Sequence, residues 1–476
     1  MSSLSIENLQ ALVILAFDDL GSGANNRAWT LIGVATRAVQ YLQLTKEQTR
    51  PDFRPFCAPY APLGRSLDWT EDEDRRRVFW CVFLLDRLCT TTTGRSTSLV
   101  PEKNRRLPCD DHVWRKQEAV STPAFGLWDK SRGHDYDPAH LPVTQDTTDN
   151  NVGRNALHDI SQPQAVSATP SDMSTVGAFA YNIEATESMS RVDLENYNDL
   201  TSWLTRFEEL DLRLVHWKML LPQRWKVNPN MTRQVPLMDP NLTAAHLIHN
   251  ASMILLHQVV AYPPATWRFG SRLPSSCSAE ACYSASTEIA LISQKYLSKS
   301  PVDSPVSSQC AFCLFIAARV LLIHWRYTLS SQLAPEFWTI IHCLDQMATK
   351  WRFPMTYATN DPINLFSKHA TTLKDLYNYH AMDATYRLDV NGYIGDLNLP
   401  CRSQGLAGTG TVGTDQLIAV QEGLNGAGTR CSADLSSIDD VPQLLADQDF
   451  FDLDRIIAFD DGCMFTAALD SLVGHG

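Results

Sequence analysis

The stretch TEDEDRRRVFWCVFLLDRLCTTTTGR, residues 70–95, passes from a cluster of charges to an apolar run within a few positions. Its acids suit the positive end of a helix dipole. An arginine follows each of the first three acids four residues later, which is the stabilising order for helical ion pairs. These pairs are Glu71 with Arg75, Asp72 with Arg76, and Glu73 with Arg77. We predict a helix over 71–89 that opens with a capping box of Thr70 and Glu73 and ends at the threonines before Gly94.

The second half of this helix is expected to be buried. Residues from Val78 to Leu85 are apolar on every side of a helix, which is typical of a core helix. Asp86 and Arg87 follow directly, and an unpaired charge in apolar surroundings is costly. We therefore interpret the segment as a capped core helix whose charges have partners, in preference to a catalytic centre or a nucleic-acid clamp.

Composition limits the kind of protein this chain can be. Its 476 residues are 44% hydrophobic and include 12 tryptophans, enough for a large core. A net charge of −13 and an isoelectric point of about 5.4 argue against a chain that grips nucleic acid by itself. Cysteines scattered within apolar patterns indicate a reduced, intracellular protein. The apolar run 310–325 is short and contains Arg319 and His324, so we expect a core helix and no membrane contact.

Amphipathic periodicity predicts an all-α fold. The first two helices are expected at 6–20 and 27–44, separated by Gly21-Ser22-Gly23. Asp239-Pro240 and Pro335 are typical helix starts with proline in the first turn. The later helical patterns cover 196–220, 239–261, 278–298, 307–331, 335–351 and 362–380.

These patterns divide the chain into five parts. A large helical domain is expected in two parts, separated by a disordered polar insertion and followed by a flexible linker and an acidic-hydrophobic tail. The insertion is rich in Asp, Asn, Ser, Thr and Pro, and the linker is rich in Gly, Thr and Ser. In chain order the five ranges are 1–129, 130–195, 196–400, 401–433 and 434–476.

Two groups of metal-binding residue types are better explained by packing. Cys310 and Cys313 have a metal-like spacing, but they lie in an apolar helical run without a second pair at a useful distance. His246, His249 and His257 share a helix without the glutamate of an H-E-x-x-H motif. We therefore expect these side chains in the core or on the surface, and no metal site.

A helical enzyme of the terpene-synthase type is a weak alternative. Asp18-Asp19 and the stretch 198–209, NDLTSWLTRFEE, look superficially suitable. Magnesium binding there needs Asn, Ser and Glu four residues apart on one helix face. Asn198 and Ser202 comply, but position 206 is Arg206. The ligand set is incomplete, and we expect no catalytic residues.

The segment RRRVFWCVFLLDRLCTTTTGRSTSL, residues 75–99, resembles the signature of the fungal-specific transcription factor regulatory domain. That family is the middle homology region of zinc binuclear cluster regulators, with an Arg-rich helix start, an aromatic run, Leu-Asp-Arg and Gly-Arg. The residues that carry the motif here are Arg75, Arg76, Arg77, Asp86, Arg87, Gly94 and Arg95. Later segments are similar in order: AWTLIGVATRAVQYLQL at 28–44, DPNLTAAHLIHNASMILLHQVVAYPP at 239–264 and CAFCLFIAARVLLIHWRY at 310–327.

The resemblance implies a nuclear, all-helical regulator that controls a metabolic or secondary-metabolite gene set transcribed by RNA polymerase II. Family members read DNA through an N-terminal cluster of six cysteines that holds two zinc ions, with C-x2-C-x6-C halves. That spacing occurs nowhere in this chain. We therefore expect no cofactor in this chain, zinc only in the missing N-terminal cluster, and DNA contact only through a missing domain or a partner.

The missing cluster leaves two kinds of regulator open. In the first kind, the DNA-binding half exists but is absent from this sequence through truncation or an incomplete gene model. In the second kind, the natural protein itself lacks that half. In the second case the chain acts without touching DNA, by dimerising with a full-length relative or by sequestering coactivators.

The tail has the composition of an activation segment. From Cys431 onward it contains ten Asp, one Arg and no Lys. Repulsion among the aspartates keeps such a segment expanded, so its apolar side chains stay available to transcription machinery or coactivators. The candidate residues are Phe450, Phe451, Leu453, Ile456 and Ile457. The alternatives are a solubilising tail or a last helix docked on the domain.

Overall fold

The protein is described by a computed structural model in which most of the described residues are helical. It describes residues 4–47, 63–102, 104–126, 173–192, 200–222, 239–263, 273, 275–301, 304, 306–328, 332–351, 364–383 and 385–397. Within these ranges the extended pairings are isolated bridges, between Arg106 and Ala124 and between Cys109 and Val176. The predicted all-α class is confirmed.

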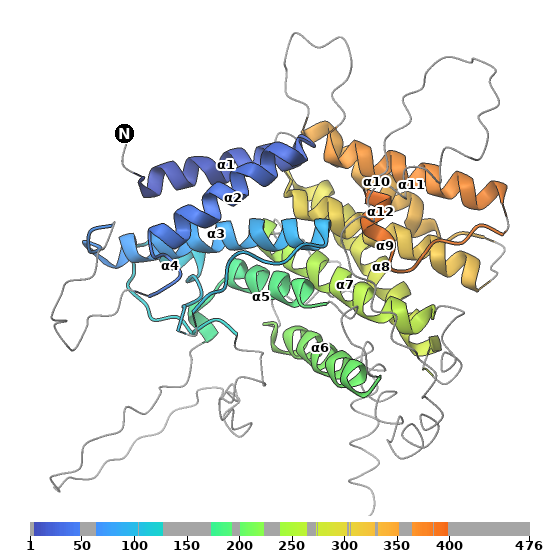
Figure 1. Ribbon diagram of the computed structural model, residues 1–476, viewed down its shortest axis with the longest axis horizontal. Helices are drawn as coiled ribbons and strands as arrows, with labels where there is room; N and C mark the ends of the chain where they lie inside the picture. The colour runs from blue at the N-terminus through green and yellow to red at the C-terminus, as the bar shows by residue number, and fades with distance from the viewer. Residues whose placement is uncertain are drawn as a thin grey trace, which may run out of the picture.

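The chain opens with a helical hairpin that lies on a long third helix (Figure 1). Helices α1 (Ile6–Gly21) and α2 (Asn25–Tyr41) both pack against α3 (Trp69–Thr93). Helix α2 ends three residues before its predicted end because Gln43 takes a left-handed φ of 56°. The amide of Leu44 then returns to a carbonyl of the last helical turn, a common way to stop a helix.

Helix α3 is longer at both ends than predicted. Asp68 is its N-cap and accepts a hydrogen bond from the amide of Glu71 at 2.9 Å, so the predicted capping box of Thr70 and Glu73 is wrong. At the other end the hydroxyls of the four threonines donate back to carbonyls within the helix. These bonds satisfy the threonine hydroxyls within the helix, so the threonines are accommodated in its last turns. Gly94, with φ of 67°, stops the helix.

The prediction of a disordered insertion over 130–195 is wrong for part of that range. A short 3-10 helix, η3 (Met173–Thr175), leads into α5 (Ala178–Ser190), which packs between α3 and α7. The acids and hydroxyls of α5 resemble a solvated surface in sequence, but nearly all its residues are buried. Residues 130–172 and 193–195 lie outside the described residues.

The second half of the chain forms a helical bundle around α9 (Figure 1). Its helices are α7 (Pro240–Ala261), α8 (Ser275–Lys299), α9 (Ser308–Tyr327), α10 (Pro335–Lys350) and α11 (Leu365–Met382). The predicted starts of α7 and α10 are confirmed. The side chain of Asp239 accepts from two amides of the first turn of α7, and Pro335 is the first residue of α10.

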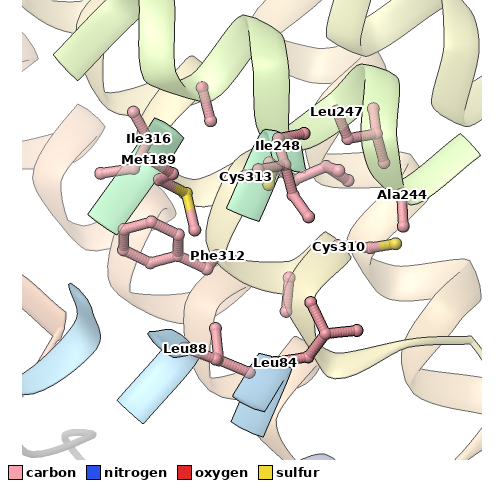
Figure 2. Close-up of a cluster of buried hydrophobic side chains, with 14 of the residues drawn as sticks. Leu84, Leu88, Met189, Ala244, Leu247, Ile248, Cys310, Phe312, Cys313 and Ile316 are labelled. Carbon is pink, nitrogen blue, oxygen red and sulfur yellow. The ribbon is translucent and has the colours of Figure 1, made fainter. Parts of the chain in front are cut away.

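Helix α9 provides the centre of the core. Figure 2 shows Phe312 and Ile316 of α9 among leucines of α3, Met189 of α5 and the apolar face of α7. Cys310 and Cys313 are buried there, as predicted, and burial raises the pKa of the Cys310 thiol to about 12. Among the described helices, α9 alone has the length and hydropathy of a membrane span, and 89% of that span is buried inside the protein.

Three further helices complete the described chain. Helix α6 (Leu200–Leu220) packs on α7 and α5 and carries its own apolar cluster, which includes Trp203 and Phe207. The short helices α4 (Asp111–Arg115) and α12 (Tyr393–Leu397) were not predicted. The predicted linker and tail, with all five candidate activation residues, lie outside the described residues.

Candidate functional site

Three motif arginines of α3, Arg76, Arg77 and Arg87, gather with acids in two charge clusters that are largely buried. We call the first the Glu73 cluster: Glu47, Glu73, Arg76, Arg77, Arg105 and Asp111. We call the second the Asp86 cluster: Asp86, Arg87, Glu184, Glu187, Arg191 and Arg213. Each has three acids and three arginines, so the charges are balanced within each cluster.

Glu73 has no solvent exposure and lies at the centre of the first cluster. Its carboxylate accepts hydrogen bonds from Arg76 and from Nε of Arg77, the latter at 3.0 Å. It also accepts the amide of Cys109 at 2.9 Å, from the segment that follows α3. The carboxylate therefore joins its own helix to a segment more than thirty residues further along the chain.

Glu47 extends this cluster to the end of the α1–α2 hairpin. Arg76 and Arg105 each reach its carboxylate at 2.8 Å. Burial opposes ionisation of Glu47, but the hydrogen bonds and positive charge of the two arginines outweigh it and lower its pKa. Burial in turn lowers the pKa of Arg105 to about 10. The predicted pair of Asp72 with Arg76 is wrong, because Arg76 points at Glu47 and Glu73 instead.

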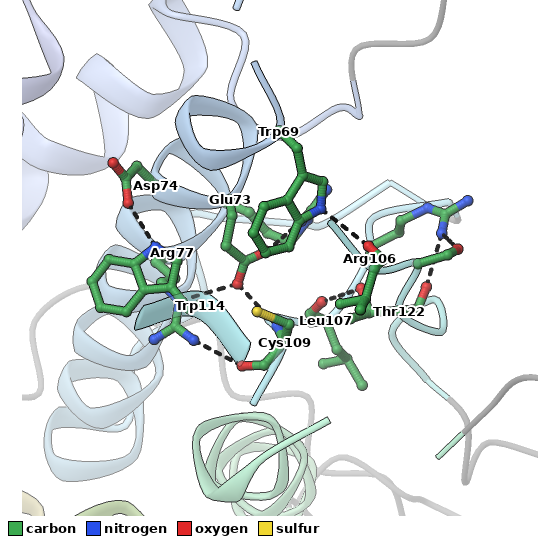
Figure 3. Close-up of polar contacts among 12 residues, drawn as sticks. Trp69, Glu73, Asp74, Arg77, Arg106, Leu107, Cys109, Trp114 and Thr122 are labelled. Atoms are coloured by element: carbon green, nitrogen blue, oxygen red, sulfur yellow. Dashed lines mark hydrogen bonds and ion pairs between the residues drawn. The ribbon is translucent and has the colours of Figure 1, made fainter. Parts of the chain in front are cut away.

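Arg77 of α3 binds residues of α4 and of the segment before it (Figure 3). It reaches Asp111 at 2.7 Å and the carbonyl oxygen of Cys109 at 2.7 Å, and its guanidinium lies 4.2 Å from the ring centroid of Trp114. The indole of Trp114 donates to Asp74 at 3.0 Å, while burial raises the pKa of Asp74. One side chain thus supplies an ion pair, a hydrogen bond and a cation–π contact.

Arg75 stands apart from these two clusters. It pairs with Glu71, one turn earlier on α3, as predicted, and donates to the carbonyl oxygen of Gly64 at 2.9 Å. It therefore fixes the segment that enters α3.

Asp86 and Arg87 begin the second cluster. The carboxylate of Asp86 accepts the amides of Ser98 and Leu99 at 3.1 Å and lies 3.0 Å from Arg87. Arg87 also reaches Glu187 of α5 at 2.9 Å. Both motif residues are about 4% exposed, so the prediction that they have buried partners is confirmed.

The acids of α5 continue the cluster toward α6. Glu187 pairs with Arg191 at 2.8 Å, and the charges of its two arginines outweigh burial and lower its pKa. Glu184 pairs with Arg213 of α6 at 2.8 Å and accepts the amide of Gly126 at 2.7 Å. Burial raises the pKa of Glu184 in spite of that arginine. The cluster therefore links α3, α5 and α6 through charged groups.

Gly94 and Arg95 form the turn at the end of α3. A Cβ atom on Gly94 would lie 2.9 Å from the side chain of Ile394 in α12, and the left-handed φ also favours glycine. The guanidinium of Arg95 lies 4.9 Å from the ring centroid of Trp29 in α2. The last motif residues thus allow α12 and α2 to approach α3 closely.

The histidines of α7 are core residues. His249 stacks on Trp217 at 4.6 Å between ring centroids, and His257 contacts Asp211 at 3.1 Å. His246 is also buried. Among the described residues no three His, Cys, Asp or Glu side chains are placed to hold a metal ion.

Two residues weighed for the terpene-synthase alternative form ion pairs, and Asn198 lies outside the described residues. Asp19 is bound by Arg27 within the first hairpin, and Arg206 pairs with Glu209 at 3.2 Å. These residues lie on helices α1 and α6, whose described contacts are with other helices. The arrangement serves to hold helices together.

Residues 1–140 match the model of one known protein family. That family is described as the fungal specific transcription factor domain. The chain is thus similar to a fungal specific transcription factor domain over residues 1–140. Within the described residues, the Glu73 cluster lies inside the range of this domain, whereas the Asp86 cluster joins the domain to α5 and α6.

Curated fungal proteins are similar to parts of the chain. An uncharacterized transcriptional regulatory protein of Schizosaccharomyces pombe is 31% identical over 128 residues, 26% of this chain and 17% of that protein. The activatory protein CHA4 of Saccharomyces cerevisiae is 35% identical over 98 residues, 21% of this chain and 14% of that protein. The Zn(2)-C6 fungal-type transcription factor FTF1c of Fusarium oxysporum is 34% identical over 92 residues, 18% of this chain and 9% of that protein.

The chain therefore matches less than a fifth of the length of each of these relatives. No solved structure matches the chain.

Sequence reasoning missed the partners of the motif residues. Glu47, Arg105, Glu184, Glu187 and Arg213 are single charges scattered along the chain, and no spacing connects them to α3. One signal was present for α5: two acids stand among small and apolar residues in a stretch of helical length, AFAYNIEATESMS.

Buried histidines make the fold sensitive to mild acid. Burial lowers the pKa of His369 and His380 from 6.5 to about 4. Between those pH values the unfolded chain binds more protons, so the free energy of unfolding falls as the pH falls. Such a histidine costs about 2 kcal/mol at pH 5. We expect the melting temperature to drop between pH 7 and pH 5.

A pair of variants tests the cause of this pH dependence. His380→Leu should flatten the dependence of melting temperature on pH, because both ring nitrogens of His380 are buried without a hydrogen-bond partner among the described residues. The control His342→Leu replaces an exposed histidine and should leave the slope unchanged. Equal slopes for His380→Leu and the unaltered chain would show that this histidine is not the cause.

Proposed function

We propose that this chain is the regulatory portion of a fungal transcription regulator. The observation that carries the proposal is the match of residues 1–140 to the fungal specific transcription factor domain, in which the motif residues Arg75, Arg76 and Arg87 are buried. The chain would act in the nucleus, on a metabolic or secondary-metabolite gene set transcribed by RNA polymerase II. Its role is regulatory and not enzymatic, which is supported by the pairing of the motif charges with one another.

DNA contact in this proposal comes from a missing domain or from a partner. The net charge of −13 repels phosphates, and the cysteine spacing of a zinc binuclear cluster is absent from the sequence. A second candidate follows from the same observation. In it the chain acts without contacting DNA, by dimerising with a full-length relative or by sequestering coactivators.

We assign the output of the chain to its acidic tail. Aspartates alternate there with the candidate residues Phe450, Phe451, Leu453, Ile456 and Ile457. Such a segment can fold on a basic-rimmed apolar groove as a short amphipathic helix. The partners would then be coactivators or general transcription machinery.

Tethering the chain to DNA tests this function. We expect the full chain, fused to a heterologous DNA-binding domain, to change transcription of a reporter in a fungal host. Removal of 434–476 should abolish the change, and Ala at Phe450, Phe451 and Leu453 should reduce it strongly. The unfused chain is the control and should leave the reporter unchanged, because it has no DNA contact.

Each arm of the experiment can fail separately. A fused chain that leaves the reporter at its basal level contradicts a transcriptional role. If reporter activity survives removal of the tail, the activity belongs to the helical domain, and the assignment to the tail is wrong. Selective retardation of duplex DNA by the unfused chain alone at physiological salt contradicts the assignment of DNA contact to another domain or chain.

A further inference from the structure

The connection between α8 and α9 contains two Ser-Pro dipeptides, Ser300-Pro301 and Ser304-Pro305. Both lie between the helices, because α8 ends before the first serine and α9 begins after the second proline. Pro301 is exposed, and the two serines are half-buried at the surface. A proline disfavours helical backbone in the residue before it and favours the extended backbone that proline-directed protein kinases bind.

The two serines differ in what their hydroxyl groups bind. The amide and the hydroxyl of Ser300 both donate to the carbonyl oxygen of Tyr296 at 2.8 Å, so Ser300 closes the last turn of α8. The hydroxyl of Ser304 makes no hydrogen bond to another residue that the structure describes. Modification of Ser304 therefore breaks no hydrogen bond of the described fold, whereas modification of Ser300 removes a bond that ends a helix.

A lysine lies beside Ser304. The carbonyl oxygen of Pro301 accepts the amide of Ser304 at 3.2 Å and also Nζ of Lys350 at 2.6 Å. The two donors share one acceptor atom, so the ammonium group is within reach of a group attached to Ser304. Phosphate on a serine carries a charge of about −2 and three acceptor oxygens, and an ammonium group donates charge-assisted hydrogen bonds to it. The N-terminus of α9 follows shortly after Ser304 and adds the positive end of a helix dipole.

The residue after Lys350 ties the same connection to two other helices. The indole of Trp351 donates to the carbonyl oxygen of Val306 at 3.0 Å, and its ring stacks on Phe366 of α11, with 6.3 Å between ring centroids. The ring also occupies the space where a Cβ atom on Gly21 of α1 would lie. The connection, the end of α10 and the end of α1 therefore meet at one junction, which a new bond to Lys350 would strengthen.

We propose that Ser304 is a phosphorylation site for a proline-directed protein kinase, and that Lys350 binds the phosphate. In the transfer, the hydroxyl oxygen of Ser304 forms a bond to the γ-phosphorus of ATP. The bond from that phosphorus to the oxygen shared with the β-phosphate breaks, ADP leaves, and the hydroxyl proton passes to a base of the kinase. The phosphate then joins the connection between α8 and α9 to the end of α10. The inference rests on this junction alone and does not require the transcriptional role.

Treatment of the purified full chain with a kinase of the mitogen-activated class and Mg-ATP tests the site. We expect phosphate on Ser304, located by peptide mass spectrometry and lost in Ser304→Ala. The matched control is Thr122-Pro123, the same kind of dipeptide in the same chain. Thr122 is 5% exposed and its hydroxyl donates to the carbonyl oxygen of Leu107 at 2.6 Å, so it should stay unmodified while the chain is folded. A folded chain without phosphate on Ser304, or with Thr122 modified as readily, overturns the proposal.

The titration of the phosphate tests the role of Lys350. By phosphorus NMR, the second pKa of the phosphate should be lower in the phosphorylated original chain than in Lys350→Gln, because the ammonium group stabilises the dianion. Lys374→Gln removes a partly exposed lysine that pairs with Asp345, and it should leave the titration unchanged. Phosphorylation should also raise the melting temperature of the original chain by about 1–2 °C, and Lys350→Gln should lose this rise. Equal titration of the phosphate in the original chain and in Lys350→Gln overturns the contact.

Discussion

We expect the Asp86→Ala variant to lose about 3–5 kcal/mol of unfolding free energy, the cost of removing one member of a buried ion pair. Asp86 is 4% exposed and accepts the amides of Ser98 and Leu99 at 3.1 Å. It also lies 3.0 Å from Arg87. Alanine leaves both amides without their acceptor and removes half of the negative charge that faces Arg87. Urea unfolding followed by tryptophan fluorescence measures the loss.

Two control variants separate the causes. Asp86→Asn keeps an acceptor for the two amides but loses the charge, so its loss should fall between that of Asp86→Ala and zero. Asp345→Ala removes an acid that is about half exposed and pairs with Lys374 at 3.0 Å. An exposed pair contributes less than about 1 kcal/mol. Equal stability of Asp86→Ala and the unaltered chain would show that the aspartate is not needed to hold α3.

The Glu73→Gln variant should lose a similar amount, about 3–5 kcal/mol, for a different reason. Glu73 faces Arg76 and Arg77 directly, with Arg105 in the same cluster, and has no exposure to water. Glutamine keeps the shape of the side chain and an acceptor for the amide of Cys109, but it leaves three arginines with the charges of two acids. Thermal and urea unfolding measure the loss.

The matched control is the same substitution two residues earlier on α3. Glu71 is about one-third exposed and pairs with Arg75, so Glu71→Gln should cost about 0.5 kcal/mol. A Glu73→Gln chain as stable as Glu71→Gln would contradict the assignment of a structural role to the Glu73 cluster. The contrast between the two variants measures what burial adds to a helical ion pair.

The sequence by itself determined most of the helices, because their signals are local. Apolar periodicity placed α1, α2 and the bundle from α7 to α11, and the Asp-Pro pair at 239–240 marked the start of α7 correctly. The continuous apolar run of α3 indicated that the helix is buried away from water. Asp86 and Arg87 were therefore expected to have charged or hydrogen-bonding partners. A resemblance carried by the residues from Arg75 to Arg95 identified the domain that the family comparison confirms.

Local reasoning failed where polar residues have distant partners. The stretch that forms α5 falls within the predicted disordered insertion, which rested on the polar composition of 130–195, yet Glu184 and Glu187 form ion pairs inside the fold with arginines of α6 and α3. The capping box at Thr70 was plausible in sequence, but Asp68 is better placed to accept the first free amide. In both cases a group outside the local pattern satisfied the polar atoms.

Tertiary structure alone decided which charges meet. Arg87 and Glu187 are 100 residues apart, and no spacing rule joins them. The sequence shows that a buried charge needs a counter-charge, because desolvation makes an unpaired one too costly. The sequence does not show which residue supplies the counter-charge, since several acids of the chain could do so. Packing of α5 against α3 selects Glu187, and the same packing brings Glu184 to α6.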